Sequence, residues 1–298
     1  MTGVKSRRLL WTAVRYSMLT GFAFISLFPY YWMISTSFKG PLEWVSYPTT
    51  WFPAKPNLDS YIFLLGASGH FFESLFGYQI LPGGIEWRGI KPILDNLVMA
   101  GGGALLTVFL AIPASYSLSR FRRDEAQLLV FIMLFEMVPQ FAVLVPIVIL
   151  FSTLKLTDTY LGMILAYTVF TLPLAIWFLK GFFDAVPIDI DEAALIDGCS
   201  RFQVIYRELL GMLGGGLWVT TLFVFIMDWS DLSLEFGLVL ADGHVTTIPA
   251  YMAGLLGIEG QLYGPMAALG TIAIIPVFAF GLAIQKHLVT GFTSGAIS

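Results

Sequence analysis

Six separate stretches of mostly apolar residues, each long enough to cross a lipid bilayer as a helix, recur along this chain of 298 residues. A helix needs about 20 such residues to span the hydrocarbon core. Soluble domains carry about 25% charged residues, whereas this chain carries 12%, together with 57% hydrophobic residues. A soluble enzyme, a disordered chain and a nucleic-acid-binding protein are therefore excluded as classes. We predict an all-α membrane protein with six transmembrane helices at about residues 11–35, 94–118, 127–151, 160–183, 212–229 and 262–285.

Basic residues are distributed unequally between the segments that join these stretches. Eleven fall on one side of the predicted membrane and five on the other, and the side richer in Lys and Arg normally stays in the cytoplasm. This asymmetry, with the even number of spans, predicts that both termini are cytoplasmic. The cytoplasmic set is Lys5, Arg7, Arg8, Arg15, Arg120, Arg122, Arg123, Lys180, Arg201, Arg207 and Lys286, and the other set is Lys39, Lys55, Arg88, Lys91 and Lys155.

The chain lacks the common signatures of catalysis. It contains no phosphate-binding P-loop, no nucleophile elbow and no zinc-protease motif, and its one cysteine and three histidines have no metal-ligand spacing. The glycine clusters 101–103 and 214–216 lie in apolar surroundings, where close helix packing explains them. We therefore expect neither a catalytic site, nor a metal, nor a cofactor on this chain. If it performs energised work, another chain hydrolyses the nucleotide.

The segment between the fourth and fifth stretches predicts two short helices joined by a turn. Pro187 and the acidic residues after it suit the first turn of a helix. Backbone N–H groups have no partner within the helix there, so the missing N–H of proline costs nothing, and negative charge is favourable. Gly198 permits a left-handed turn that ends this helix, and a second helix begins near Ser200. The apolar faces of both helices leave one side available for a partner. They are formed by Leu195, Ile196, Phe202, Ile205, Tyr206 and Leu209.

This segment also carries a family resemblance. The order Glu192-Ala193-Ala194, then Gly198, then Ile205 and Leu209-Leu210 resembles the EAA loop of permease subunits in ATP-binding-cassette importers. The chain as a whole resembles their carbohydrate-type, MalG-like members, whose type I importer fold and bacterial inner-membrane location it implies. Further matching motifs are Ser119-Arg120-Phe121, Met137-Val138-Pro139-Gln140, Leu172-Pro173, Lys180-Gly181-Phe182-Phe183 and the tail from Gln285 to Ala296.

The resemblance implies how such a chain is organised. Residues 1–298 form one permease domain, with a periplasmic loop at 36–93 and a cytoplasmic coupling loop at 187–210. The stretch 66–92 is longer than is usual in the family. Gly211 stands where the family usually has proline after leucine. Glycine can bend the chain but does not force a break, so the sequence does not determine the angle at which the fifth span enters the membrane. The tail 286–298 is expected either to reach the ATPase interface or to fray.

The resemblance also implies partners. These are a second, MalF-like permease, two ATPase subunits that carry ATP and magnesium, and a periplasmic or lipid-anchored solute-binding protein. Glu192 would meet a basic residue of an ATPase, Ala193 and Ala194 would allow close approach, and Gly198 would form the turn. The residues assigned to ATPase coupling are Glu192, Ala193, Ala194, Asp197, Gly198 and Arg201.

Charged residues within predicted spans are candidates for the substrate path, because charge is costly in a bilayer. Glu136 lies in the third span beside Pro139, which frees backbone carbonyls that are tolerated where they line a cavity. We expect Glu136 and Gln140 to accept hydrogen bonds from the hydroxyls of a sugar or polyol. The alternative is that Glu136 pairs with a neighbouring helix or subunit.

A second acidic group lies at the end of the fifth span. Asp228 can accept hydroxyl donors and Trp229 can stack on the apolar side of a sugar ring, with Asp231 and Glu235 close behind. The alternative is an interfacial anchor for Trp229 and solvated acids.

Two other functions remain open at this point. A stand-alone secondary transporter of a small polar solute needs coupling-ion sites and often has inverted repeats. A membrane-embedded enzyme needs a nucleophile–base or metal constellation. We detect none of these features in the sequence, and an importer permease for a sugar, oligosaccharide or polyol is the preferred interpretation.

Overall fold

The computed structural model describes residues 2–65, 89–121, 125–239, 243–257 and 260–294, and it is overwhelmingly helical. Four of its helices are long and apolar enough to cross a membrane, or up to six if each of two bent helix pairs forms one span. The predicted stretch 66–92 falls mainly outside the described residues, as does the end of the predicted tail. The elements are α1 Thr2–Ser37, α2 Pro41–Trp44, α3 Asp59–Leu64, α5 Ile90–Phe121, α6 Glu125–Glu136, α7 Gln140–Thr153, α8 Tyr160–Asp184, α9 Ile188–Ile196, α10 Arg201–Gln203, the π-helix η1 Val204–Leu209, α11 Leu210–Met212, α12 Gly214–Ser230, α13 Glu235–Leu238, α14 Ile248–Gly254 and α15 Tyr263–Ser294, with a two-stranded antiparallel ladder of β1 Leu256–Gly257 and β2 Gly260–Gln261.

The chain divides into two compact units, which are described separately. The first comprises residues 1–89 and 254–274, and the second comprises residues 90–253 and 275–298. The helix α15 contributes to both.

In the first unit, α1 keeps its apolar side chains on the outside. None of the helix's most apolar window is buried, as expected of a helix that faces lipid. Lys39, which follows α1, is only 2% exposed, because its Nζ donates to the carbonyl of Thr50 at 2.6 Å and lies 4.1 Å from the centre of the Trp32 ring. Trp51 in turn packs against Trp32. The segment after α1 is therefore folded back onto the end of that helix.

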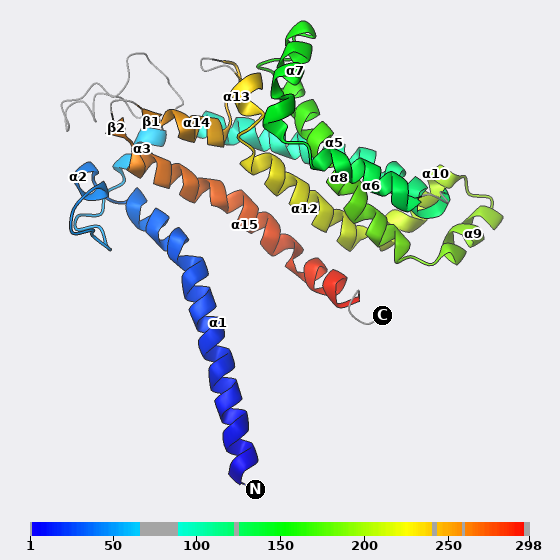
Figure 1. The fold of residues 1–298 in the computed structure, drawn as a ribbon, viewed down its shortest axis with the longest axis horizontal. Helices are drawn as coiled ribbons and strands as arrows, with labels where there is room; N and C mark the ends of the chain where they lie inside the picture. Colours follow the sequence, from blue (N-terminus) through cyan, green and yellow to red (C-terminus); the bar gives the residue numbers. More distant parts are fainter. Residues whose placement is uncertain (1, 66–88, 122–124, 240–242, 258–259, 295–298) are drawn as a thin grey trace. The chain divides into compact units, whose positions relative to one another are not determined.

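The second unit is built around α5, α8 and α12, which pack against one another (Figure 1). Small and apolar side chains such as Ala100, Ala111 and Ala175 are completely buried between these helices. Polar contacts also join the helices, and one of them links the hydroxyls of Thr107 and Thr171 at 3.2 Å. This bundle is the rigid frame on which the polar side chains of the unit are held.

One predicted span is broken by a sharp bend, and a second sharp bend lies at the start of another predicted span. Residues 127–136 of α6 and α7 meet at 83° around Pro139, which cannot donate a hydrogen bond to the preceding turn. The helical run from Arg201 to Met212 meets α12 at 86°, with the break at Leu213 and not at Gly211. The other four predicted spans each correspond to one continuous helix, namely α1, α5, α8 and α15.

Candidate functional site

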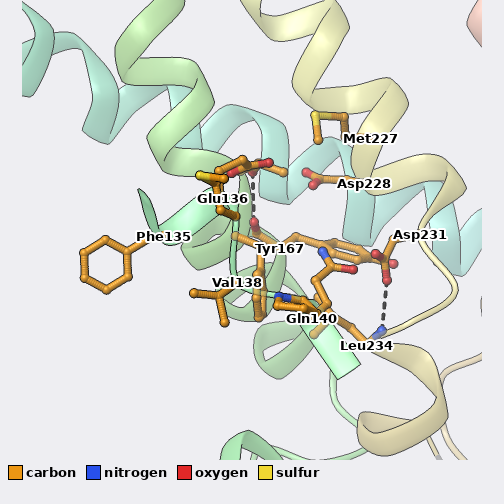
Figure 2. A pocket seen from close by; sticks show the side chains of 13 residues that line it. Phe135, Glu136, Val138, Gln140, Tyr167, Met227, Asp228, Asp231 and Leu234 are labelled. Atoms are coloured by element: carbon orange, nitrogen blue, oxygen red, sulfur yellow. Dashed lines mark hydrogen bonds between the residues drawn. The ribbon is translucent and has the colours of Figure 1, made fainter. Parts of the chain in front are cut away.

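A cavity of about 260 Å³ opens in the second unit where the α6–α7 break faces α8 and the end of α12 (Figure 2). Glu136 and Gln140 flank the break, while Asp228 lies in the last turns of α12. The structure therefore brings together three of the four residues that the sequence assigned to the substrate path. The lining is completed by Phe135, Met137, Val138, Pro139, Tyr167, Phe170, Thr171, Met227, Asp231 and Leu234.

Asp228 is the most deeply buried acidic side chain that lines this cavity. Its side chain is almost fully buried, at 1% exposed, and neither carboxylate oxygen accepts a hydrogen bond from another described residue. It fits against α5 because Gly103 has no side chain: a Cβ there would lie 2.8 Å from Asp228 Oδ2. The glycine cluster 101–103 thus provides space for a carboxylate as well as for helix packing.

Trp229, the fourth predicted residue, does not line the cavity. Its ring stacks on that of Phe225 with centroids 5.3 Å apart, and its carbonyl accepts a hydrogen bond from Asn96 Nδ2 at 3.0 Å. The ring of Trp229 therefore packs on Phe225 of its own helix and is not part of the cavity lining.

Three further polar residues belong to this region: Asp231 and Glu235, which the sequence placed in one acidic group with Asp228, and Tyr167, which the sequence did not assign. Asp231 follows α12 and lines the cavity, and burial raises the pKa of its carboxyl, opposed by hydrogen bonds from the backbone of Leu234 and the side chain of Gln140. Behind it, Tyr167 donates to Glu235 Oε1 at 3.4 Å. Burial raises the pKa of Glu235 to about 8. Clusters of charge at the end of a span are visible in a sequence, but Tyr167 sits in an apolar run and gave no such signal.

The predicted coupling segment forms a second candidate site. α9 ends at Ile196, and Gly198 takes a φ of +87°, which supplies the left-handed turn. Ser200 then opens the next helix through a capping box: its hydroxyl accepts from Gln203 N at 3.3 Å, and Gln203 Oε1 accepts from Ser200 N at 2.7 Å. Local sequence therefore determines the helix–turn–helix shape.

A buried ion pair joins this segment to α5. Arg120 donates through Nε to Asp191 Oδ2 at 3.1 Å, and its Nη2 donates to the carbonyl of Val186 at 2.9 Å. The two charged side chains are only 7% and 5% exposed. A second contact places the Arg201 guanidinium 4.3 Å from the centre of the Phe121 ring. Sequence reasoning singled out the Ser119-Arg120-Phe121 motif but did not identify its partners.

Most of the residues assigned to coupling are exposed on this segment. Ala194 is buried, whereas Glu192, Ala193, Asp197, Gly198 and Arg201 are exposed. Apolar neighbours are exposed as well, notably Ile196 at 86% and Phe202 at 66%. A solvated loop does not normally present such side chains together, so this is a surface suited to a protein partner.

The sequence profile described as "Binding-protein-dependent transport system inner membrane component" matches residues 103–294 of this chain. The chain belongs to this family. As one of its members, the chain is a transport component of a membrane and not an enzyme, and it acts within a system that includes a binding protein. This sets aside both the stand-alone transporter and the membrane-embedded enzyme.

Relatives within the family match the chain along nearly its whole length. A probable ABC transporter permease protein, y4oR of Sinorhizobium fredii, is 31% identical over 99% of this chain and 98% of its own length. The trehalose/maltose transport system permease protein MalG of Thermococcus litoralis is 28% identical over 92% of each chain. Among solved structures, a chain of a bacterial ABC transporter that imports the acidic polysaccharide alginate shares the fold, with a TM-score of 0.68 at 17% identity over 93% of this chain and 96% of that chain.

The family match covers both candidate sites. Residues 103–294 include the cavity from Glu136 to Leu234 and the coupling segment from Pro187 to Leu210. In a binding-protein-dependent family member, one site is suited to a polar solute and the other to a protein partner.

Proposed function

We propose that this chain is a permease subunit of an ATP-driven importer that carries a sugar, oligosaccharide or polyol across a bacterial inner membrane. The helices α1, α5, α8 and α15, with the two bent pairs, make six spans, and both termini lie in the cytoplasm. The partners are a second permease, two ATPase subunits that bind ATP and magnesium, and a periplasmic or lipid-anchored binding protein. The carbohydrate permeases among the relatives support this substrate class.

The observation that carries the proposal is the coupling segment. It presents exposed apolar and acidic side chains to a partner, yet Arg120–Asp191 ties it firmly to α5. A movement imposed on α9 by an ATPase is therefore passed directly to a helix of the bundle. In this mechanism, ATP closes the ATPase dimer, the segment transmits the movement, and the cavity alternates between the two sides of the membrane.

Solute passes through the cavity beside the α6–α7 break. Glu136, Gln140 and Asp228 offer acceptor oxygens to hydroxyl groups, and Phe170 and Met227 offer apolar surface to the carbon face of a sugar ring. Since Glu136 is exposed in the isolated chain, the second permease subunit completes this part of the path.

The decisive experiment is purification of the tagged chain from its native membrane. We expect a second permease and an ATPase to co-purify, and ATP hydrolysis to rise when the binding protein and its solute are added. Uptake measurements with a panel of sugars, sugar acids and polyols then identify the solute. A chain that purifies alone and transports solute unaided in vesicles would contradict the proposal.

A further inference from the structure

The charges around the cavity all have one sign. Glu136, Asp228 and Asp231 line it, and none of the described residues in its lining is Lys, Arg or His. A cavity lined by one sign of charge and by low-dielectric walls concentrates ions of the opposite sign and repels those of the same sign.

The carboxyl oxygens of Asp228 are hydrogen-bond acceptors that lack a donor among the described residues. Burial of a polar group costs free energy unless a hydrogen bond compensates for it, and both oxygens of Asp228 are buried without one. The hydroxyl of Thr171, which also lines the cavity, donates to the carbonyl of Tyr167 at 2.8 Å. A ligand with hydroxyl groups satisfies Asp228, whereas a ligand carboxylate, sulfonate or phosphate adds further acceptor oxygens beside the carboxyl groups of the lining.

The remaining lining suits the uncharged part of such a ligand. Phe170, Met227 and Leu234 provide apolar surface beside the carboxylates, which is the combination that a sugar ring with its hydroxyl edge and carbon face requires. Figure 2 shows Asp228, Asp231 and Gln140 approaching the cavity from α12, its following loop and α7.

We propose that this cavity selects solutes by charge: it accepts uncharged polyhydroxylated compounds, whose hydroxyls donate to Asp228 and Glu136, and it rejects sugar acids. This inference rests on the proposed function, because it treats the cavity as part of the solute path. It distinguishes the present chain from an importer of acidic saccharides, although such an importer shares its fold.

The test uses two thiol reagents of similar size and opposite charge on the complete importer in membranes. Cys199, the single cysteine, is replaced by serine, and Gln140→Cys places a reporter thiol in the cavity. The reagents are the cationic trimethylammonioethyl methanethiosulfonate and the anionic sulfonatoethyl methanethiosulfonate. The ratio of their reaction rates at the protein thiol is divided by the ratio of their reaction rates with mercaptoethanol, an uncharged thiol in solution. We expect the cationic reagent to be favoured about tenfold.

Neutralising the lining should abolish this preference. With Glu136→Gln, Asp228→Asn and Asp231→Asn combined, the normalised ratio should fall to within about twofold of unity, because the source of the field is removed. Asp189→Asn, which removes an exposed carboxylate of α9, should leave the ratio unchanged. A ratio near unity in the reporter protein, or failure of both reagents to react with and without ATP, would overturn the proposal.

The same preparation separates this inference from the proposed function. If ATPase subunits co-purify and the binding protein stimulates hydrolysis, the importer assignment stands whatever the reagents show. Identification of a sugar acid as the transported solute would then overturn charge selection alone. If no ATPase co-purifies, the proposed function itself fails.

Discussion

Gly103 is the residue on which the position of the buried carboxylate depends. An added Cβ would lie 2.8 Å from Asp228 Oδ2 and 3.0 Å from Tyr167 Cβ, so Gly103→Ala forces a displacement inside a packed interface. We expect it to cost about 1 to 3 kcal/mol of stability and to reduce solute uptake, measured by thermal melting of the purified complex and by transport assay.

Gly101 is the matched control, since a Cβ there meets no atom within 4 Å. Gly101→Ala should leave uptake unchanged and leave stability equal or slightly raised, because alanine favours a helix more than glycine does. Equal behaviour of the two variants would show that Gly103 has no special role in holding Asp228.

Glu235 makes stability depend on pH. Burial raises its pKa from an ordinary value of 4.5 to about 8. Between these values the unfolded chain releases a proton that the folded chain retains, so stability falls as pH rises through this window and then levels off. Glu235→Gln removes this dependence. We expect the variant to melt several degrees above the parent at about pH 8 and to show no such gain at about pH 5.

The exposed Glu208 provides the comparison for that experiment. Glu208→Gln should melt with the parent protein at both pH values. A Glu235→Gln variant that is destabilised equally at both pH values would indicate instead that the ionised carboxylate is the stabilising form.

Individual residues differ in how far sequence alone identifies them. Glu136, Gln140 and Asp228 could be identified from the sequence because polar residues inside apolar runs are conspicuous, and the structure brings them together. Tyr167 was not, because one more aromatic residue in an apolar helix carries no signal. Trp229 was assigned with Asp228 because the two are neighbours in the sequence, and its ring packs on Phe225 outside the cavity lining. Arg120 and Asp191 are 71 residues apart, and no local pattern links them.

At the scale of elements, the proposed mechanism requires the Arg120–Asp191 joint between α5 and α9 to move the coupling segment together with the bundle. Asp191→Asn leaves the Arg120 guanidinium, whose side chain is 7% exposed, without its counter-charge. Removal of one member of a buried pair is strongly destabilising, and we expect a loss on the order of 3 kcal/mol. Thermal melting checks the loss, and ATPase assays should show weaker stimulation by the binding protein.

Asp189 supplies the control for this change, because it occupies the same first turn of α9 but is exposed. Asp189→Asn removes an equal charge from the same helix N-terminus and should alter stability by no more than about 0.5 kcal/mol. If the two variants behaved alike, the Arg120–Asp191 pair would not be the joint.

The bent elements were harder to predict than the straight ones. Hydrophobic length alone located α1, α5, α8 and α15, because a long apolar run has few alternatives in a membrane. The same criterion predicted a continuous span at 127–151, where the structure has a bend, whereas the bend near the span predicted at 212–229 lies at Leu213, beside its first residue. Proline and glycine indicated that breaks were possible, but the 83° and 86° bends depend on packing against other helices.

At the scale of the whole molecule, the two candidate sites lie on one mechanical unit. The cavity and the coupling segment both belong to the unit that contains α5, α8 and α12. α5 touches both sites, through Gly103 at the cavity and Arg120 at the coupling segment. In the proposed mechanism, a helix that contacts both sites connects ATP-driven movement with solute access.

This connection is tested by changing the docking surface without touching the bundle. Glu192 is exposed and makes none of the described contacts that hold α9 to α5. Glu192→Lys reverses the charge offered to a basic partner, so we expect the binding protein to lose its stimulation of ATP hydrolysis at least tenfold. The melting temperature of the permease should not change, because no buried group is altered. Glu192→Gln keeps the shape and removes only the charge, and it should show an intermediate loss. ATPase assays of the reconstituted complex, with and without binding protein, measure both, and normal stimulation in the lysine variant would place the ATPase contact elsewhere.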